Sequence, residues 1–222
     1  MNHDIELFTI TNFAQFVSHW AHDLRSPFNH ILGFTKIVLN GQDGPLTDLQ
    51  KEDLSTAYHS SLRAMTLVNN LIDIARIIEQ QKEINLADVR VAQIVEPALH
   101  QWKKANPTRE LQIENAIESN ATLVRADEAQ LRQAIIALIA YLAEFVEAPV
   151  ALSLRAENEP DWCLITLQTK GKKAHHPSAF DLEMYGFIGR SLIELQHGKI
   201  RQWGETDDGA VLTIAMPLAQ AD

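Results

Sequence analysis

The sequence is poor in three features that would mark common classes of protein. Its single cysteine, Cys163, excludes an internal disulfide and lies in an apolar run, so we expect a buried thiol in a reducing compartment. Its longest charge-free apolar run, residues 133–143, is about half of the roughly 20 residues that a membrane helix needs. Nineteen Lys and Arg face 29 Asp and Glu, and the net charge of -10 argues against a nucleic-acid partner. With no basic-then-apolar leader, we expect a cytoplasmic protein without membrane insertion.

What the chain has instead is a long helical pattern near its start. Apolar residues recur three or four positions apart through residues 12–40, which predicts one amphipathic helix. At about 100° per residue, His22 falls roughly 200° from this stripe and should face water. The stripe consists of Phe13, Phe16, Val17, Trp20, Leu24, Phe28, Ile31 and Val38.

The residues after His22 define a polar neighbourhood on the same helix. Arg25 and Ser26 follow by three and four positions and share its face, while Asp23 lies at its flank. Pro27 removes a backbone donor and clashes with the carbonyl of Asp23, so we expect a kink just past the histidine. Taken alone, this pattern also fits a solvated histidine near a kink.

The run from Phe16 to Phe34, centred on His-Asp-Leu-Arg-Ser-Pro, resembles the phosphoacceptor box of sensor histidine kinases. The resemblance implies that His22 accepts a phosphoryl group and that Asp23 is the neighbouring acid or base. Ser26 occupies the position where the family usually has Thr or Asn, which is associated with orienting water for dephosphorylation.

A second periodic run, from Leu54 to Ile78, follows a turn at residues 41–46. Two helices joined by a short loop predict an antiparallel hairpin. A lone hairpin leaves apolar surface in water, so we expect a homodimeric four-helix bundle, as the resemblance also implies. The alternative is that the hairpin packs only on its own chain.

Beyond residue 86 the pattern changes to mixed elements. We predict helices at residues 91–105, 127–146 and 180–196, strands at 110–117, 121–125, 150–156 and 162–168, and a closing hairpin of 199–203 with 210–216. This order predicts helices on one face of a mixed sheet, similar to the ATP-binding domain of histidine kinases. The overall class is therefore α+β, with a dimerisation and phosphoacceptor domain at 1–83 and an ATPase-like α/β sandwich at 84–222.

The second domain departs from the family at its nucleotide site. Magnesium needs oxygen ligands, and a phosphate loop needs unobstructed backbone amides. The departures are Ala137 and Tyr141 at the family's asparagine positions, Thr169 and Lys173 in the adenine loop, and Glu183 and Tyr185 at the later glycines. The lid loop is also much shortened. We therefore expect this chain to bind no cofactor or metal.

A retained phosphoacceptor beside a degenerate nucleotide site predicts a histidine phosphotransfer protein of a phosphorelay. In this hypothesis the neutral His22 imidazole moves a phosphoryl group between receiver-domain aspartates. Asp23 fixes the tautomer or takes the proton, and Arg25 neutralises phosphoryl oxygens. Magnesium comes with the receiver domain. The alternatives are a sensor histidine kinase with a diverged ATP site and a catalytically silent pseudokinase scaffold that binds response regulators.

Two other groups of residues have simpler explanations. His19 and His22 are three residues apart, but the sequence places no third ligand beside them, so we do not expect a zinc site. Lys170, Lys172 and Lys173 most simply belong to a solvated loop.

Overall fold

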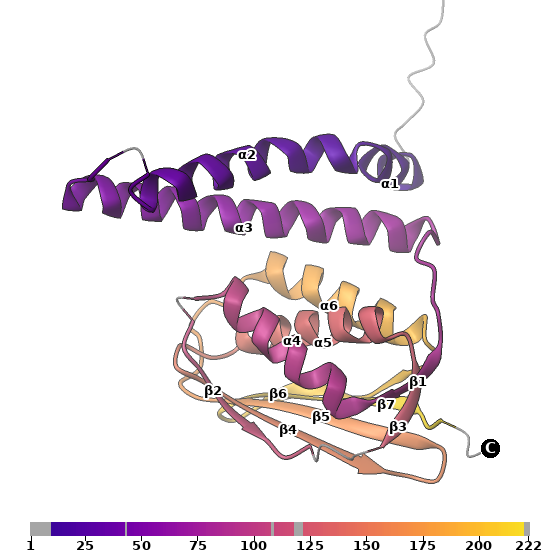
Figure 1. Cartoon of the computed structure of the whole chain (residues 1–222). Helices are drawn as coiled ribbons and strands as arrows, with labels where there is room; N and C mark the ends of the chain where they lie inside the picture. The colour runs from indigo at the N-terminus through magenta and orange to yellow at the C-terminus, as the bar shows by residue number, and fades with distance from the viewer. Residues whose placement is uncertain (1–9, 43, 108, 118–121, 220–222) are drawn as a thin grey trace, which may run out of the picture. The chain divides into compact units, whose positions relative to one another are not determined.

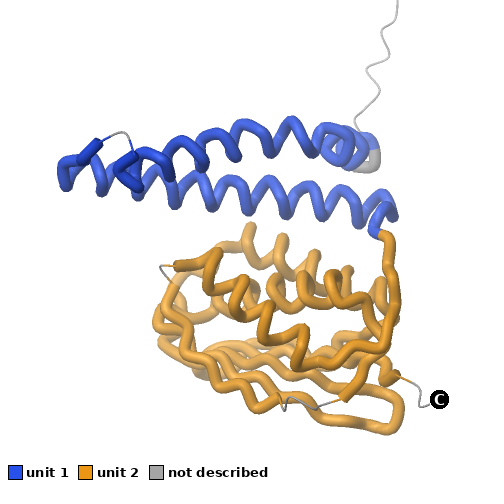
Figure 2. The backbone as a smooth tube through the Cα atoms, in the orientation of Figure 1, with its two compact units in different colours: residues 1–82 blue, residues 83–222 orange. Residues whose placement is uncertain are grey.

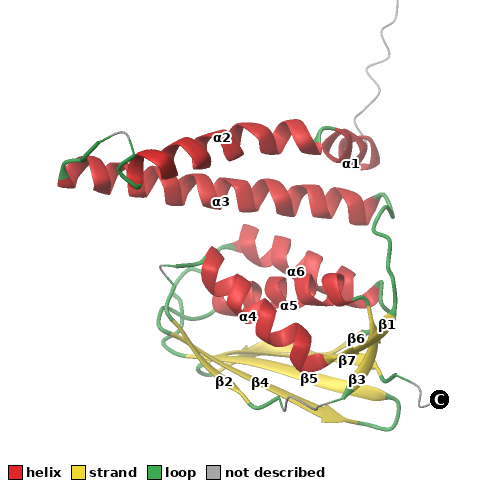
Figure 3. Cartoon of the chain, viewed as in Figure 1, coloured by secondary structure: helices red, strands yellow, loops and turns green. Residues whose placement is uncertain are grey.

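A computed structural model describes residues 10–42, 44–107, 109–117 and 122–219. The chain divides into two compact units, residues 1–82 and 83–222 (Figure 2). The described part of the first unit is built of helices, and the second combines helices with strands (Figure 3). None of the described helices is both long enough and apolar enough to cross a bilayer.

The first unit consists of α1 (Ile10–His19), α2 (Ala21–Leu39) and α3 (Asp48–Ile78). Helices α2 and α3 lie side by side and form the predicted hairpin (Figure 1). Thr47 starts α3 with a capping box, because its hydroxyl accepts from the Gln50 amide and the Gln50 side chain accepts from the Thr47 amide. Gly41, with φ of 72°, occupies the left-handed region just after α2, where glycine is favoured.

The prediction of one helix through residues 12–40 is wrong. The helix is interrupted at Trp20, before the histidine, and α2 runs through Pro27 without a break. Figure 1 shows α1 at a steep angle to α2. This change of direction lets both segments pack on α3, since Ala14 and Val17 from α1 and Ala21 from α2 share one buried cluster with α3.

Much of the predicted apolar stripe stays exposed in the single chain. Phe13, Phe16, Trp20 and Ile31 of this stripe are 45–50% exposed, although an amphipathic helix normally buries such side chains. Phe34, which lies outside the predicted stripe, is 69% exposed. Among its described residues, the other large apolar side chains that the first unit exposes are Ile37, Leu49, Leu71 and Ile78. The hairpin therefore has more apolar surface than its own contacts cover.

The second unit packs helices on one face of a five-stranded sheet of order β2-β4-β5-β7-β6 (Figure 1). Strand β2 pairs parallel with β4, and the other neighbours pair antiparallel. The strands are β2 (Leu111–Asn115), β4 (Val150–Asn158), β5 (Trp162–Lys170), β6 (Lys199–Thr206) and β7 (Gly209–Pro217). The helices are α4 (Val91–Ala105), α5 (Glu128–Ala143) and α6 (Ala179–Glu194).

The strands and helices of this unit follow from their apolar patterns. Residues alternate between buried and less buried along β4 and β5, so one face of the sheet meets the helices. Helix α5 buries residues all round because it contacts α4, α6 and the strands β5 and β7. The predicted α+β class, with a helical hairpin followed by a mixed α/β domain, is confirmed.

The sequence did not predict β1 (Ala87–Arg90), although it did predict a strand at residues 121–125, where its partner lies. Strand β1 pairs antiparallel with β3 (Leu123–Ala126) in a separate two-stranded sheet. Residue 121, which the predicted strand included, lies outside the described residues. Asp127 anchors this region, since its carboxylate accepts from the amides of Asn85 and Gln130.

Cys163 is buried, as predicted. Its side chain lies on the face of the sheet that packs against the helices, and burial raises the pKa of the thiol to about 11. The thiol therefore stays protonated and unreactive at neutral pH, because the thiolate is the nucleophilic form.

We predict that Gly189→Ala destabilises the chain while Gly33→Ala stabilises it. An added Cβ at Gly189 would lie 2.5 Å from Leu138 Cδ2 and 2.7 Å from its Cγ, whereas one at Gly33 meets nothing within 4 Å. Overpacking typically costs about 1–3 kcal/mol, and replacing an exposed helical glycine by alanine gains up to about 1 kcal/mol. Urea unfolding of the full chain measures both. A Gly189→Ala variant as stable as the parent would contradict the close packing of α5 and α6.

Candidate functional site

His22 is the second residue of α2 and projects into solvent. Its side chain is 93% exposed, whereas the neighbouring Ala21 is buried against α3. A single residue step, about 100° around the helix, thus separates the packed face from the face that carries the imidazole. The imidazole ring is therefore open to a reactant that approaches from solvent.

Among the described residues, Asp23 is the side chain that lies within hydrogen-bond distance of the His22 ring. Its Oδ1 lies 3.3 Å from Nδ1, and the carboxylate is itself 63% exposed. In the tautomer with the proton on Nδ1, the ring donates to Asp23 and keeps the Nε2 lone pair free. An exposed imidazole with one available lone pair can act as a nucleophile.

Arg25 bonds to the facing helix α3, whereas Asp23 lies beside the His22 ring. Its Nε donates to the Asn69 Oδ1 across the hairpin at 2.7 Å, and the pair is partly buried. Arg25 therefore ties α2 to α3 close to His22. Ser26, also predicted as a site residue, is half-buried one turn after the histidine.

Asn69 is the residue of this neighbourhood that the sequence did not reveal. It lies 44 positions after Arg25, on the facing helix. No local spacing connects the two residues, and only the packing of α2 on α3 brings them together. The apolar period of α3 marks its face but not its register against α2.

The described residues offer no group of three His, Cys, Asp or Glu side chains able to hold a metal ion. The ring of His19 packs edge-on against Trp20, with centroids 5.2 Å apart. The structure therefore gives no support to a site shared by His19 and His22.

In the second unit, two of the six diverged positions lie on α5. Ala137 is buried, and Tyr141 packs its ring against Trp203 at 4.7 Å and Phe145 at 5.3 Å. Trp203 is covered in turn by the Arg190 guanidinium, 5.2 Å from the ring. These side chains form an aromatic cluster and offer no amide oxygen to a metal.

The adenine-loop positions are also occupied by internal contacts. Thr169 is completely buried, and its hydroxyl donates to the carbonyl oxygen of Leu142 at 3.1 Å, with Ala210 O at 3.4 Å. Lys173 forms an ion pair with Glu205 at 3.6 Å. The donor set therefore does not fit Mg-ATP in the way that the resemblance implies.

Helix α6 begins at Ala179 and takes in the positions of the later glycines. Glu183 is exposed and Tyr185 is half-buried, so neither lies in a free loop. The nearby glycines have packing roles, because Gly186 faces Tyr141 and Trp203, and Gly189 approaches Leu138. The sequence shows these glycines, but it does not show which side chains pack against them.

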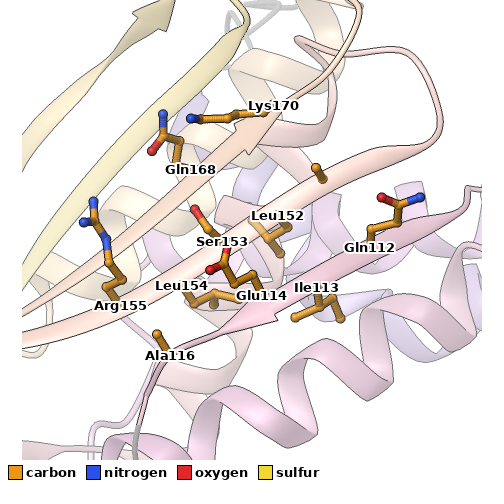
Figure 4. Close-up of a pocket in the computed structure, with 11 residues that line it drawn as sticks. Gln112, Ile113, Glu114, Ala116, Leu152, Ser153, Leu154, Arg155, Gln168 and Lys170 are labelled. Atoms are coloured by element: carbon orange, nitrogen blue, oxygen red, sulfur yellow. The ribbon is translucent and has the colours of Figure 1, made fainter.

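A cavity of about 470 Å³ lies elsewhere in this unit, over β2, β4 and β5 (Figure 4). None of the six diverged positions lines it. Its polar side chains are Gln112, Glu114, Ser153, Arg155, Gln168 and Lys170. Arg155, Lys170 and Glu114 mix positive and negative charge along this face of the sheet, so the cavity does not favour a ligand of one charge.

Comparison with known proteins adds two kinds of match. Residues 14–80 match the family model of the His Kinase A (phospho-acceptor) domain. The circadian input-output histidine kinase CikA of Synechococcus elongatus is 22% identical, over 92% of this chain and 30% of its own length. An uncharacterised sensor-like histidine kinase of Rhizobium meliloti is 23% identical, over 93% of this chain and 38% of its own. The chain thus spans about a third of the length of these relatives.

Two solved structures share the fold. Full-length ShkA, in complex with AMPPNP, superposes with a TM-score of 0.69 at 20% identity, covering 93% of this chain and 46% of that one. The histidine kinase AdeS of Acinetobacter baumannii gives 0.59 at 19% identity, covering 90% of this chain and 98% of its own. The homologues are sensor histidine kinases, so these matches favour our alternative hypothesis, a sensor kinase, over a dedicated phosphotransfer protein.

We predict that Arg25 and Asn69 are energetically coupled. A double-mutant cycle of Arg25→Ala and Asn69→Ala should give a coupling free energy of about 0.5–1.5 kcal/mol, the usual net value of a hydrogen bond. The free energies of unfolding in urea supply the cycle. His22→Ala with Asn69→Ala is the matched control and should give about zero, because His22 is exposed and contacts Asp23 instead. Equal coupling in both cycles would contradict the assignment.

Proposed function

Because this chain carries a His Kinase A phospho-acceptor domain followed by a histidine kinase-like ATPase fold, we propose that it is the phosphoacceptor part of a sensor histidine kinase with a diverged nucleotide site. His22 is the residue that carries the phosphoryl group. The observation behind this proposal is the 93% exposed imidazole beside a carboxylate, inside the matched residues 14–80.

In the proposed step, the Nε2 lone pair of His22 attacks the phosphorus of a phosphoryl donor. The N–P bond forms while the bond from phosphorus to the donor's leaving oxygen breaks, and that oxygen keeps the electron pair. Nδ1 retains its proton, and Asp23 Oδ1 at 3.3 Å stabilises the positive charge that develops on the ring. Such transfer depends mainly on alignment and charge.

Arg25 acts mainly as a positioning residue in this proposal. Its bond to Asn69 holds the turn of α2 that carries His22 against α3. Ser26 remains a candidate for orienting the water that removes the phosphoryl group. The partner is a receiver domain, whose aspartate exchanges the phosphoryl group with His22 and whose acidic pocket brings the magnesium.

A second candidate is the relay, in which His22 takes its phosphoryl group from one receiver and gives it to another. The internal contacts of Thr169 and Tyr141 favour it, since both side chains are engaged within the fold where the family would hold nucleotide. The homologues favour the kinase. Only the source of the phosphoryl group separates the two.

The experiment incubates the full chain with labelled ATP, and separately with a labelled phospho-receiver. We expect acid-labile label on the parent and none on His22→Gln. The control His19→Gln, which changes an exposed histidine at the end of α1, should keep the parent level. Label from ATP alone supports the diverged kinase, and label only from the receiver supports the relay. No label from either source would overturn the assignment and leave the pseudokinase scaffold. Label that survives in His22→Gln would also overturn it, because another residue would then carry the phosphoryl group.

We also propose that two hairpins pair through the exposed apolar face of α2 to form a four-helix bundle. Ile31, Phe34 and Ile37 recur every three residues on this helix, and all are exposed in the single chain. A second copy would remove this surface from water.

Phe34→Glu should therefore weaken self-association. Burying a phenylalanine side chain contributes about 1.5–3 kcal/mol, so the dissociation constant should rise about tenfold or more. Sedimentation velocity over a concentration series measures it. Phe180→Glu is the control, because Phe180 is 63% exposed but lies on α6 of the second unit. A parent chain that stays monomeric, or equal effects of both variants, would contradict the bundle.

A further inference from the structure

The cavity over β2, β4 and β5 lies on the face of the sheet that turns away from the helices (Figure 4). Leu152 and Leu154 of β4 are buried on the helix side, so the alternate residues Ala151, Ser153 and Arg155 belong to the opposite face. At about 470 Å³, the cavity is within the range of small-molecule sites. None of the residues that we assign to phosphoryl transfer lines it, so a ligand here would be additional to that reaction.

Side-chain sizes and strand register produce this hollow. Ala151 and Ser153 provide a floor of small side chains on β4. Longer side chains form a wall on either side, because each floor residue is paired with one residue of β2 and one of β5. The β2 wall consists of Gln112 and Glu114, and the β5 wall consists of Gln168 and Lys170. Figure 4 shows Ser153 at the centre, with Glu114 on one side and Gln168 on the other.

The two walls carry opposite charges. Glu114 supplies a carboxylate to the β2 wall, and Lys170, the last residue of β5, supplies an ammonium group to the other. Both side chains are exposed. Among the described residues, neither has an ion-pair or hydrogen-bond partner for its side chain. Each charge is therefore available to a ligand, and a ligand that meets both walls must carry both signs.

The spacing of these charges sets the length of the ligand. Glu114 and Lys170 are two strands apart and one row of side chains out of line, which places their Cα atoms about 12 Å apart at usual strand dimensions. Side chains stand roughly perpendicular to a sheet, and a hydrogen bond of about 2.8 Å at each end leaves about 6 Å between the two charges of a ligand. An extended dipeptide spans up to about 7 Å. A single amino acid is too short to reach both walls.

Other kinds of ligand fit this cavity less well. The described residues offer no group of three side chains able to hold a metal ion. A phosphate would meet the carboxylate of Glu114 as well as the cations. An apolar molecule would meet little besides Ala116 and Ala151, since Leu152 and Leu154 are buried on the other face.

We propose that this cavity binds a zwitterionic dipeptide. The ammonium group of the dipeptide donates to the Glu114 carboxylate, and its carboxylate accepts from the Lys170 ammonium and the Gln168 side-chain amide. The backbone of the dipeptide crosses β4 over Ala151 and Ser153. Because both termini are recognised, a peptide blocked at either end binds weakly.

The test is calorimetric titration of the full chain with glycylglycine. We expect saturable binding, which Glu114→Gln and Lys170→Gln should each weaken about tenfold or more, the effect of losing a charge-assisted hydrogen bond. Glu96→Gln and Lys103→Gln change exposed residues of α4 and should bind like the parent. Thermal unfolding checks that each variant is folded.

Blocked ligands and exchanged charges test the same two contacts. N-acetylglycylglycine lacks the ammonium group and glycylglycinamide lacks the carboxylate, so each should bind about tenfold more weakly or worse. Glycine carries both charges but is too short, and it should also bind weakly. Glu114→Lys should lose binding, and its combination with Lys170→Glu should regain it, because the dipeptide can then bind in the opposite direction.

Several results would overturn the proposal. Absence of saturable glycylglycine binding to the parent is one, and unchanged binding by a folded Glu114→Gln or Lys170→Gln is another. Glycine that binds as tightly as glycylglycine would instead place a single amino acid between Glu114 and Arg155. If glycylglycine fails to bind and Glu114→Lys weakens self-association, this face of the sheet pairs two copies of the chain and does not hold a small ligand.

Discussion

The structure of the first unit depends on one buried cluster of small and branched side chains. Ala14, Val17 and Ala21 pack with Ile72 and Ala75 of α3. Because this cluster takes one residue in α2 and two in α1, the chain changes direction between them at Trp20. Burial of Ala21 fixes the rotation of α2, and the next residue along the chain therefore stands in water. The exposure of His22 is thus a consequence of core packing.

In the second unit, the positions where the resemblance implies a nucleotide site are occupied by contacts within the fold. Where a nucleotide would need polar ligands and open loops, the chain has buried alanine, an aromatic cluster around Tyr141 and a threonine whose hydroxyl is used internally. Such contacts keep the sheet and helices packed without a ligand. The exposed imidazole of His22 and these internal contacts are the two observations that our proposed function joins.

Much of this could be predicted from the sequence, for identifiable reasons. The helix at residues 91–105 was predicted with its observed ends, and the strands of β4 and β5 were predicted to within two residues, because their apolar periods are strong. The break at Trp20 was missed because apolar spacing continues across it. Strand β1 was missed because four residues with little burial carry almost no periodic signal.

By itself, the sequence determined the α+β class, the helical hairpin and the outward direction of His22, because helical period and turn residues are local properties. Tertiary structure alone decided the partner of Arg25 and the packing roles of Gly186 and Gly189. Each of these depends on which residues distant in the chain meet across helices. That register is set by how side chains fill space together, which no local pattern encodes.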